Sequence, residues 1–409
     1  MKQSSILPTI LGGENRHIVL FGRTGSGKTS IFDQLVENNQ VEFQIKKGNA
    51  KYSPVVGRCR LGHAGEVTLI DTAGLDDVNE LGSEQAQHTR NIIRRADIAI
   101  YVINIQEFDH KAREAYRRAH DWMEQNMVPY LQVFNRCDET YVGDIAKLKT
   151  EFPDAIFIST YTPGSISLLR TRLSQMVRSL KAQEAPLVPE KLIQKGDYVL
   201  MLVPDPGLIH EYAIVMELMD RGARCVMIHE DDLEAAMREI PRIDLVVAYA
   251  RSFGKVRDIV PENIPLTSYS LLYGLKSGVL ESFIEGARAI GTLTKDSHVL
   301  IAVGNKQSEI YKEIGRIKIP RSMRRLIGEE LQIDYSFGLD LPENLGEYDL
   351  VIHDTGATMS QRSIQARVAI CQEAGVPVAN YGTILAALAG VLDRCKNALL
   401  PEQEEEEAF

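Results

Sequence analysis

Short apolar runs alternate with longer amphipathic stretches along most of the chain. In the first 182 residues each apolar run is followed by a polar segment, and helical periodicity appears between runs, for example in residues 83–95. Runs typical of buried strands lie at residues 17–21, 67–70, 98–105, 130–134 and 155–158. This alternation predicts an α/β domain.

Residues 182–195 interrupt the pattern, because proline and charged residues replace the periodic apolar ones. The alternation then resumes. It predicts strands at 198–203, 225–229, 245–250, 298–302, 333–337, 350–353 and 376–379, and helices at 209–220, 231–240, 280–290, 320–327, 360–373 and 384–399. Residues 242–250 and 347–355 resemble each other, so we expect them to form equivalent strands.

The patterning therefore predicts three α/β domains and a tail. The first domain spans residues 1–183, and two smaller domains with mostly parallel sheets span 196–270 and 271–401. Residues 402–409 are rich in glutamate and are predicted to form a solvated acidic tail.

Composition narrows the class of protein. Of 409 residues, 44% are hydrophobic and 25% are charged, as in soluble globular proteins. The formal net charge of −10 argues against nucleic-acid binding, and no apolar stretch approaches the length of a membrane span. Five cysteines are scattered without a C-x-x-C pair, which argues against disulfides and zinc. We expect a cytoplasmic protein that contacts neither nucleic acid nor membrane.

A phosphate-binding loop follows the first predicted strand. Residues 22–29 fit the pattern G-x-x-x-x-G-K-[ST], and a predicted helix begins after them. Backbone N–H groups of such a loop point at a polyphosphate, while the lysine contacts the β- and γ-phosphates and Thr29 completes a Mg²⁺ site. The residues predicted to bind nucleotide here are Gly22, Gly25, Ser26, Gly27, Lys28, Thr29 and Ser30.

A second nucleotide motif lies at the end of the next buried strand. Asp71 to Gly74 fit D-x-x-G, in which the carboxylate reaches Mg²⁺ through water and the glycine N–H senses the γ-phosphate. We therefore assign Lys28, Asp71 and Gly74 to phosphate chemistry, and Thr29 and Asp71 to Mg²⁺.

A base-reading motif follows the strand at 130–134. Asn135-Arg-Cys-Asp138 resembles the N-K-x-D guanine motif of GTPases, with arginine in place of lysine. The Asp carboxylate accepts from two guanine N–H groups, whereas adenine would leave that charge unpaired. Ser159 and Thr160 lie where a base-contacting loop is expected, and an ordinary strand-end turn is the alternative. The four motifs in this order predict a GTP-binding domain.

Three departures from active GTPases bear on hydrolysis. No threonine lies between Thr29 and Thr68, so the switch threonine that normally caps Mg²⁺ is missing. Residue 75 is leucine where Ras-type enzymes orient water with glutamine, and Gly25 occupies the position of the asparagine of potassium-activated GTPases. The sequence predicts hydrolysis that is slow or depends on a partner.

Six further stretches resemble one protein family over nearly the whole chain. They are residues 71–77, 265–270, 314–320, 341–345, 348–353 and 374–382. The chain thereby resembles the HydF family, the GTPases of [FeFe]-hydrogenase H-cluster maturation. The resemblance implies an α/β protein with an N-terminal P-loop GTPase domain of the TrmE/Era type, a middle dimerisation domain and a C-terminal iron–sulfur cluster domain. It also implies GTP and Mg²⁺ as cofactors, a homodimer, and the hydrogenase or other maturation proteins as partners.

The cluster motif of that family is degenerate in this sequence. The family pattern C-x-H followed by H-C-x-x-C falls on Asn305, Gln307, His353, Asp354 and Ala357. Only the histidine matches, and thiolates are the ligands that hold iron–sulfur clusters. We therefore expect no iron–sulfur cluster, and we expect His353 to be a strand-end histidine.

Two functional hypotheses stay open at this point. The first is a GTP-binding protein of the hydrogenase-maturation scaffold or carrier type, with weak or conditional GTPase activity. The second is a non-catalytic, GTP-sensing dimeric scaffold that is paralogous to the maturase. A third, a tRNA-modification GTPase, is disfavoured by the acidic composition and by the lack of a C-terminal cysteine motif.

Overall fold

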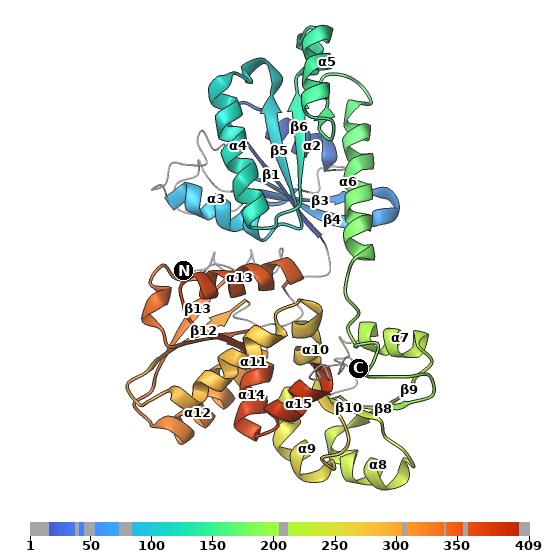
Figure 1. Ribbon diagram of the computed structural model, residues 1–409, viewed down its shortest axis with the longest axis vertical. Coiled ribbons are helices and arrows are strands. Elements are labelled where there is room, and N and C mark those ends of the chain that lie inside the picture. The colour runs from blue at the N-terminus through green and yellow to red at the C-terminus, as the bar shows by residue number, and fades with distance from the viewer. Residues whose placement is uncertain are drawn as a thin grey trace, which may run out of the picture. The chain divides into compact units, whose positions relative to one another are not determined.

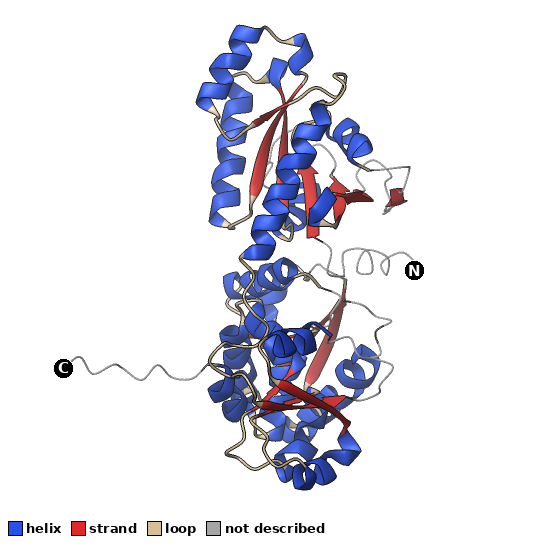
Figure 2. Ribbon diagram, turned by 90° about the vertical axis from the view of Figure 1, so that its right-hand side faces the viewer, coloured by secondary structure: helices blue, strands red, loops and turns tan. Residues whose placement is uncertain are grey.

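A computed structural model describes residues 16–36, 41–44, 54–72, 84–203, 212–304, 308, 310–338, 341–354 and 359–400 (Figure 1). The chain divides into two compact units, which meet in the sequence at Glu184 and Ala185. In both units, strands lie between helices, as expected for α/β proteins (Figure 2). No helix in the described ranges has the length and apolar character needed to cross a membrane.

The first unit is built on a seven-stranded sheet with the order β2-β3-β4-β1-β5-β6-β7. Its parallel strands are β1 (Arg16–Phe21), β4 (Glu66–Asp71), β5 (Ile98–Asn104), β6 (Tyr130–Asn135) and β7 (Ile156–Phe157). Its helices are α2 (Lys28–Leu35), α3 (Glu84–Arg94), α4 (His110–Gln125), α5 (Val142–Glu151) and α6 (Ser165–Ala182). The α/β prediction is confirmed, and the central strands β1, β4 and β5 are buried nearly throughout.

Two antiparallel strands at one side of this sheet were not predicted. They are β2 (Val41–Gln44) and β3 (Val55–Arg60), which pair with each other and, through β3, with β4. The sequence there is polar and interrupted by Gly57, which normally weakens a strand. In the structure a β-carbon at Gly57 would lie 2.8 Å from the Val36 side chain and 2.9 Å from that of Phe32. A larger residue would clash with these two side chains, so the close packing at this position requires glycine.

The second unit holds two parallel four-stranded sheets. The first consists of β8 (Tyr198–Val203), β9 (Arg224–His229), β10 (Leu245–Ala248) and β11 (Leu266–Ser268), in the order β11-β10-β8-β9. The second consists of β12 (His298–Val303), β13 (Gln332–Phe337), β14 (Leu350–His353) and β15 (Val378–Asn380), in the order β15-β14-β12-β13. The two orders are the same when the strands are numbered within each sheet.

Matching contacts show that the two sheets are tandem copies of one motif. The backbone N–H of Tyr198 donates to the Asp244 carboxylate (2.9 Å), and that of His298 donates to the Asp349 carboxylate (2.8 Å). Asp244 lies just before β10, which pairs with β8, the first strand of the first copy. Asp349 likewise lies just before β14, which pairs with β12, the first strand of the second copy. The predicted equivalence of residues 242–250 and 347–355 is thus confirmed, because β10 and β14 occupy the same place.

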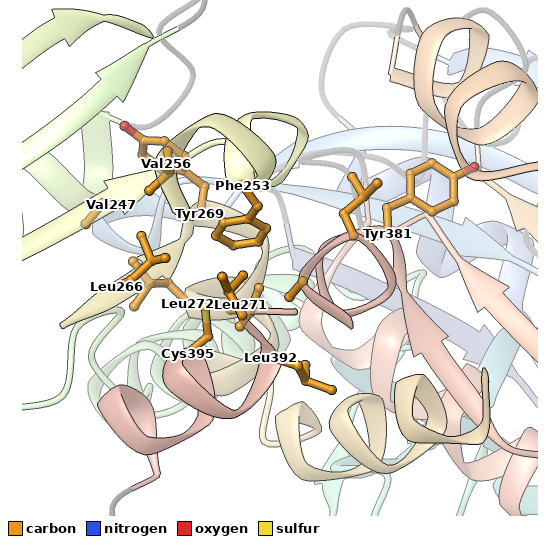
Figure 3. Packing of buried hydrophobic residues seen from close by; sticks show 14 of the residues in the cluster. Val247, Phe253, Val256, Leu266, Tyr269, Leu271, Leu272, Tyr381, Leu392 and Cys395 are labelled. Carbon is orange, nitrogen blue, oxygen red and sulfur yellow. The ribbon is translucent and has the colours of Figure 1, made fainter. Parts of the chain in front are cut away.

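Helices connect and cover these strands. The first copy contains α7 (Tyr212–Asp220), α8 (Leu233–Glu239), α9 (Phe253–Ile259), α10 (Tyr269–Lys276) and α11 (Leu280–Arg288). The second contains the π-helix η8 (Tyr311–Lys318), α12 (Ile319–Ile327), α13 (Gln361–Glu373), α14 (Tyr381–Ala389) and α15 (Leu392–Leu399). Side chains of α9, α10, α14 and α15 meet in one hydrophobic core that both copies share (Figure 3).

One helix prediction is wrong. The apolar periodicity of residues 384–399 predicted a single helix, but α14 ends at Ala389 and α15 begins at Leu392. Gly390 between them has φ 73°, a left-handed conformation that ends a helix. Gly278 has φ 69° between α10 and α11 of the first copy, so the break belongs to the repeated motif.

Candidate functional site

The phosphate loop connects β1 to α2 and contains three glycines with positive φ. Gly22, Gly25 and Gly27 have φ values of 142°, 81° and 91°, which side chains disfavour. A β-carbon at Gly22 would lie 2.3 Å from the Val102 carbonyl oxygen, and one at Gly27 would lie 2.2 Å from the amide nitrogen of Asn135. The loop therefore closes against β5 and the base motif only when these two positions are glycine.

The loop is folded around the ammonium group of Lys28. This side chain is 6% exposed, and its Nζ donates to the carbonyl oxygens of Gly22 (3.1 Å) and Arg23 (2.9 Å). Lys28 is also the first residue of α2, so its charge lies at a helix N-terminus. A buried cation at this place is suited to the phosphates of a nucleotide. Ser30 is exposed two residues further along α2, and Ser26 is buried.

A hydroxyl and a carboxylate meet beside the loop. Thr29 Oγ1, in the first turn of α2, donates to Oδ2 of Asp71, the last residue of β4, at 2.7 Å. Burial raises the pKa of Asp71 above its ordinary value of 3.8, while the Thr29 hydrogen bond and the Lys28 charge act in the opposite direction. The other oxygen, Oδ1, is buried and has no hydrogen-bond partner in the described part of the chain. A hydroxyl and an unsatisfied carboxylate oxygen fit the oxygen preference of Mg²⁺.

Asn135 joins the base motif to the phosphate loop. It ends β6, is 1% exposed, and its Nδ2 donates to the Ser26 carbonyl oxygen at 3.1 Å. The sequence pattern assigned it to base reading and did not reveal this contact, which holds the two halves of the site together. Asp138 is exposed, and its carboxylate makes no hydrogen bond or ion pair within the described ranges.

The loop after β7 lies directly beside the base motif. The backbone N–H of Cys137 donates to the Ile158 carbonyl oxygen at 3.2 Å. Ser159 is 3% exposed; its N–H donates to Ser165 Oγ (2.9 Å), and its own Oγ accepts from the Tyr161 N–H (3.0 Å). The Thr160 N–H has no partner among the described residues and can donate to a bound group. Gly74, Leu75 and the rest of residues 73–83 lie outside the described residues.

The second unit contains one described residue that matches the cluster motif. His353 ends β14, is 1% exposed, and packs near Phe283 with 6.2 Å between ring centroids. Burial, aided by the Arg367 charge, holds the pKa of His353 well below its ordinary 6.5, so the ring is neutral. Neither ring nitrogen has a hydrogen-bond partner among the described residues. Asp354 is buried beside it, whereas Asn305, Gln307 and Ala357 lie outside the described residues.

The residue types at the five motif positions differ from those that hold an iron–sulfur cluster. No thiol lies at any of the five motif positions, and the described residues include no group of three or more His, Cys, Asp or Glu side chains that could hold a metal ion. Cys371 and Cys395 are buried on α13 and α15, and burial raises the pKa of each thiol to about 12. Such thiols stay protonated near neutral pH, whereas a cluster needs thiolates.

Comparison with protein-family models gives three consecutive matches. Residues 17–136 match the 50S ribosome-binding GTPase family, residues 188–278 the hydrogen maturase F dimerization domain, and residues 281–397 the hydrogen maturase F tetramerization domain. The last two matches together span more than half of the 409 residues. The chain belongs to the hydrogen maturase F family. The HydF resemblance inferred from the sequence is thus confirmed, and the matches support self-association of this family member.

Several solved structures of GTP-binding proteins and of the FeoB iron transporter are similar to part of this chain. The G domain of the T. maritima FeoB iron transporter is 17% identical, with TM-score 0.33, over 41% of this chain and 99% of that one. Aquifex aeolicus Era is 15% identical, with TM-score 0.32, over 52% of this chain and 91% of that one. A GTP-binding protein from Sulfolobus solfataricus is 21% identical, with TM-score 0.31, over 40% of this chain and 53% of that one. No curated protein matches the chain.

Proposed function

We propose that this HydF protein binds GTP with Mg²⁺ and serves [FeFe]-hydrogenase maturation as a GTP-controlled scaffold. The observation that carries the proposal is the hydrogen bond from Asn135 to the Ser26 carbonyl oxygen, because it ties a base-reading motif to a phosphate loop. A nucleotide that spans both parts would meet a buried ammonium group at one end and the free Asp138 carboxylate at the other.

The main predicted site residues have distinct roles in this proposal. Lys28 and the backbone of the glycine loop bind the phosphates, Thr29 and Asp71 hold Mg²⁺, and Gly74 senses the γ-phosphate. Asp138 accepts from guanine, and the Thr160 N–H donates to the guanine carbonyl oxygen. When bound, Mg²⁺ neutralises phosphate charge, and the chain supplies the oxygen ligands and the position.

Hydrolysis is proposed to be slow or dependent on a partner. Leucine at position 75 cannot orient an attacking water, and the stretch from 30 to 67 contains no threonine to cap Mg²⁺. The alternative, a purely GTP-sensing scaffold, shares the binding site and differs only in turnover. A phosphate-release assay with and without potassium separates them, since measurable turnover removes the non-catalytic alternative.

The scaffold is proposed to lack the family's [4Fe–4S] cluster. The support is the set of residue types at the five motif positions and the apolar, cationic surroundings of His353. Amide, carboxylate and methyl side chains are poor replacements for thiolates. The protein would then control hydrogenase or maturase partners through its nucleotide state, without a cluster of its own.

Self-association is proposed to use an apolar surface in the dimerization match. Met216 and Met219 on α7 are 56% and 58% exposed, and Met227 on the adjacent β9 is 36% exposed. β9 is the last strand of its sheet, so its outer backbone groups are available to a second copy. Exposed apolar side chains next to an open edge are typical of a subunit interface.

The guanine assignment is tested by competition. We expect GTP and GDP to displace a fluorescent GDP analogue, and ATP to fail at a concentration about 100-fold higher, because adenine leaves Asp138 unpaired. Asp138→Asn should reduce guanine affinity by about 100-fold and improve xanthine binding. Equal competition by ATP, or an unchanged base preference in Asp138→Asn, would refute the proposed function.

A further inference from the structure

One aromatic side chain beside the base motif has no role in the function proposed so far. Tyr161 is 74% exposed and follows Thr160 in the loop between β7 and α6. Its ring makes no aromatic or cationic contact within the described ranges. Isolated exposed rings are common on protein surfaces, so it is the location of Tyr161 that needs an explanation.

The backbone around Tyr161 is held firmly while its ring is free. The Tyr161 N–H donates to Ser159 Oγ (3.0 Å), the Thr162 N–H donates to the Ser159 carbonyl oxygen (3.2 Å), and Gln34 Nε2 donates to the Thr160 carbonyl oxygen (2.7 Å). The hydrogen bond from Cys137 to Ile158 places this loop next to Asp138. The ring therefore extends from a fixed turn at the edge of the sheet where a base would bind.

We propose that the Tyr161 ring stacks on one face of the guanine base that Asp138 reads. This inference rests on the proposed function. Asp138 and the Thr160 N–H act on polar groups in the plane of the base and leave its two faces without contacts. A flat, partly apolar ring covers such a face well, and stacking is insensitive to the identity of the purine. Tyr161 would thus contribute affinity and residence time, while Asp138 determines base selectivity.

Tyr141 provides a matched control. It is 77% exposed, and it follows the same base motif as the residue before α5. A β-carbon on Gly143 would lie 2.6 Å from the Tyr141 ring, so this ring is turned toward its own helix. The two tyrosines have similar exposure and lie in neighbouring loops, but the Tyr141 ring lies against its own helix, so we expect it not to stack on the base.

The test compares GDP and GTP affinities of full-length variants by calorimetry. Tyr161→Ala should weaken both nucleotides equally, by about 10- to 100-fold, while Tyr161→Phe retains wild-type affinity. Tyr141→Ala should leave affinity unchanged. Selectivity for guanine over adenine should be the same in all three variants, because the Asp138 carboxylate is untouched.

A fluorescence measurement detects stacking directly. The chain has one tryptophan, Trp122, so a Trp122→Phe background is dark at tryptophan wavelengths. In that background, GDP should quench the fluorescence of Tyr161→Trp and leave that of Tyr141→Trp unchanged. Unchanged affinity in Tyr161→Ala together with no quenching overturns the stacking proposal. If Asp138→Asn still alters base preference in that case, the proposed function survives; if it does not, both fail.

Discussion

Two polar sites lie at the carboxyl ends of parallel strands in this protein, and their surroundings differ. In the first unit, Asp71 and Asp138 each present a carboxylate oxygen without a partner in the described chain. In the second unit, the ring nitrogens of His353 have no hydrogen-bond partner among the residues that the structure describes, and the ring lies near Phe283 and Arg367. Parallel sheets commonly bind ligands at this edge. The same place in a parallel sheet can thus present exposed or unsatisfied carboxylates in one unit and a buried, neutral imidazole in the other.

The largest expected effect comes from Gly27→Val. A β-carbon at position 27 would lie 2.2 Å from the Asn135 amide nitrogen, and φ is 91°. The valine side chain must therefore move the phosphate loop away from the base motif. We expect GTP affinity to fall by at least about 100-fold, measured by calorimetry.

Gly25→Asn is the control for that substitution. No atom lies within 4 Å of a β-carbon at Gly25, and asparagine tolerates the left-handed region that φ 81° requires. Its nucleotide affinity should stay within about threefold of wild type. An intact site in Gly27→Val would show that the two halves are not coupled as described.

The next largest effect is the pH dependence of Mg²⁺-dependent GTP binding. Since burial raises the pKa of Asp71 above 3.8, its proton is bound at a higher pH than in an ordinary aspartate. Mg²⁺ must displace that proton, so Mg²⁺-dependent GTP binding should weaken as the pH falls toward the raised pKa of Asp71. Asp71→Asn should bind Mg²⁺–GTP weakly at every pH and show no such slope. A slope that persists in Asp71→Asn would assign the pH dependence to another group.

His353→Leu should have the smallest effect, and it should stabilise the protein, whereas the substitutions above weaken nucleotide binding. Burying ring nitrogens without partners costs about 1–3 kcal/mol, so an apolar residue of similar volume should raise the free energy of unfolding by about 1 kcal/mol. The lowered pKa of His353 means that the unfolded chain binds a proton below pH 6.5 and the folded chain does not. Stability should therefore fall with acid below pH 6.5 in the wild type, and less so in His353→Leu.

Thermal melts between pH 5 and pH 8 check this prediction. His110→Leu, at an exposed histidine, is the control for the substitution itself. A loss of stability in His353→Leu at neutral pH would mean that the imidazole has a hydrogen-bond partner. The site at His353 would then differ less from the site at Asp71 and Asp138.

The sequence predicted the parts that depend on local pattern. Strand ends carry Asp71, Asn135 and Asp138, and their spacing from the phosphate loop identified the nucleotide site. The contact of Asn135 with Ser26 could not be predicted, because 109 residues separate the two positions and the contact arises only in the folded sheet. The contact of His353 with Phe283 on α11 could not be predicted for the same reason, because 70 residues separate the two rings.

Two errors in the fold prediction have local causes. No strand was predicted between residues 41 and 65, because that segment is polar and interrupted by glycine, although Gly57 leaves room for the side chains of Phe32 and Val36. Gly390 was not recognised as a helix end, because alanine and leucine continue the apolar pattern on both sides. In the sequence, the tandem motif was visible in only one pair of strands. Asp244 and Asp349 accept from backbone N–H groups, so the residues that donate to them need not be alike in the two copies.

The central claim is that this HydF protein keeps a GTP site and lacks the cluster ligands. Anaerobic iron–sulfur reconstitution tests it most directly, with iron content and EPR as readouts, in the wild type and in a variant carrying Asn305→Cys, Gln307→His, Asp354→Cys and Ala357→Cys. Because the unmodified chain lacks thiolates at the motif positions, a cluster of roughly four irons per chain should form only in that variant. A [4Fe–4S] cluster in the unmodified protein would contradict this claim.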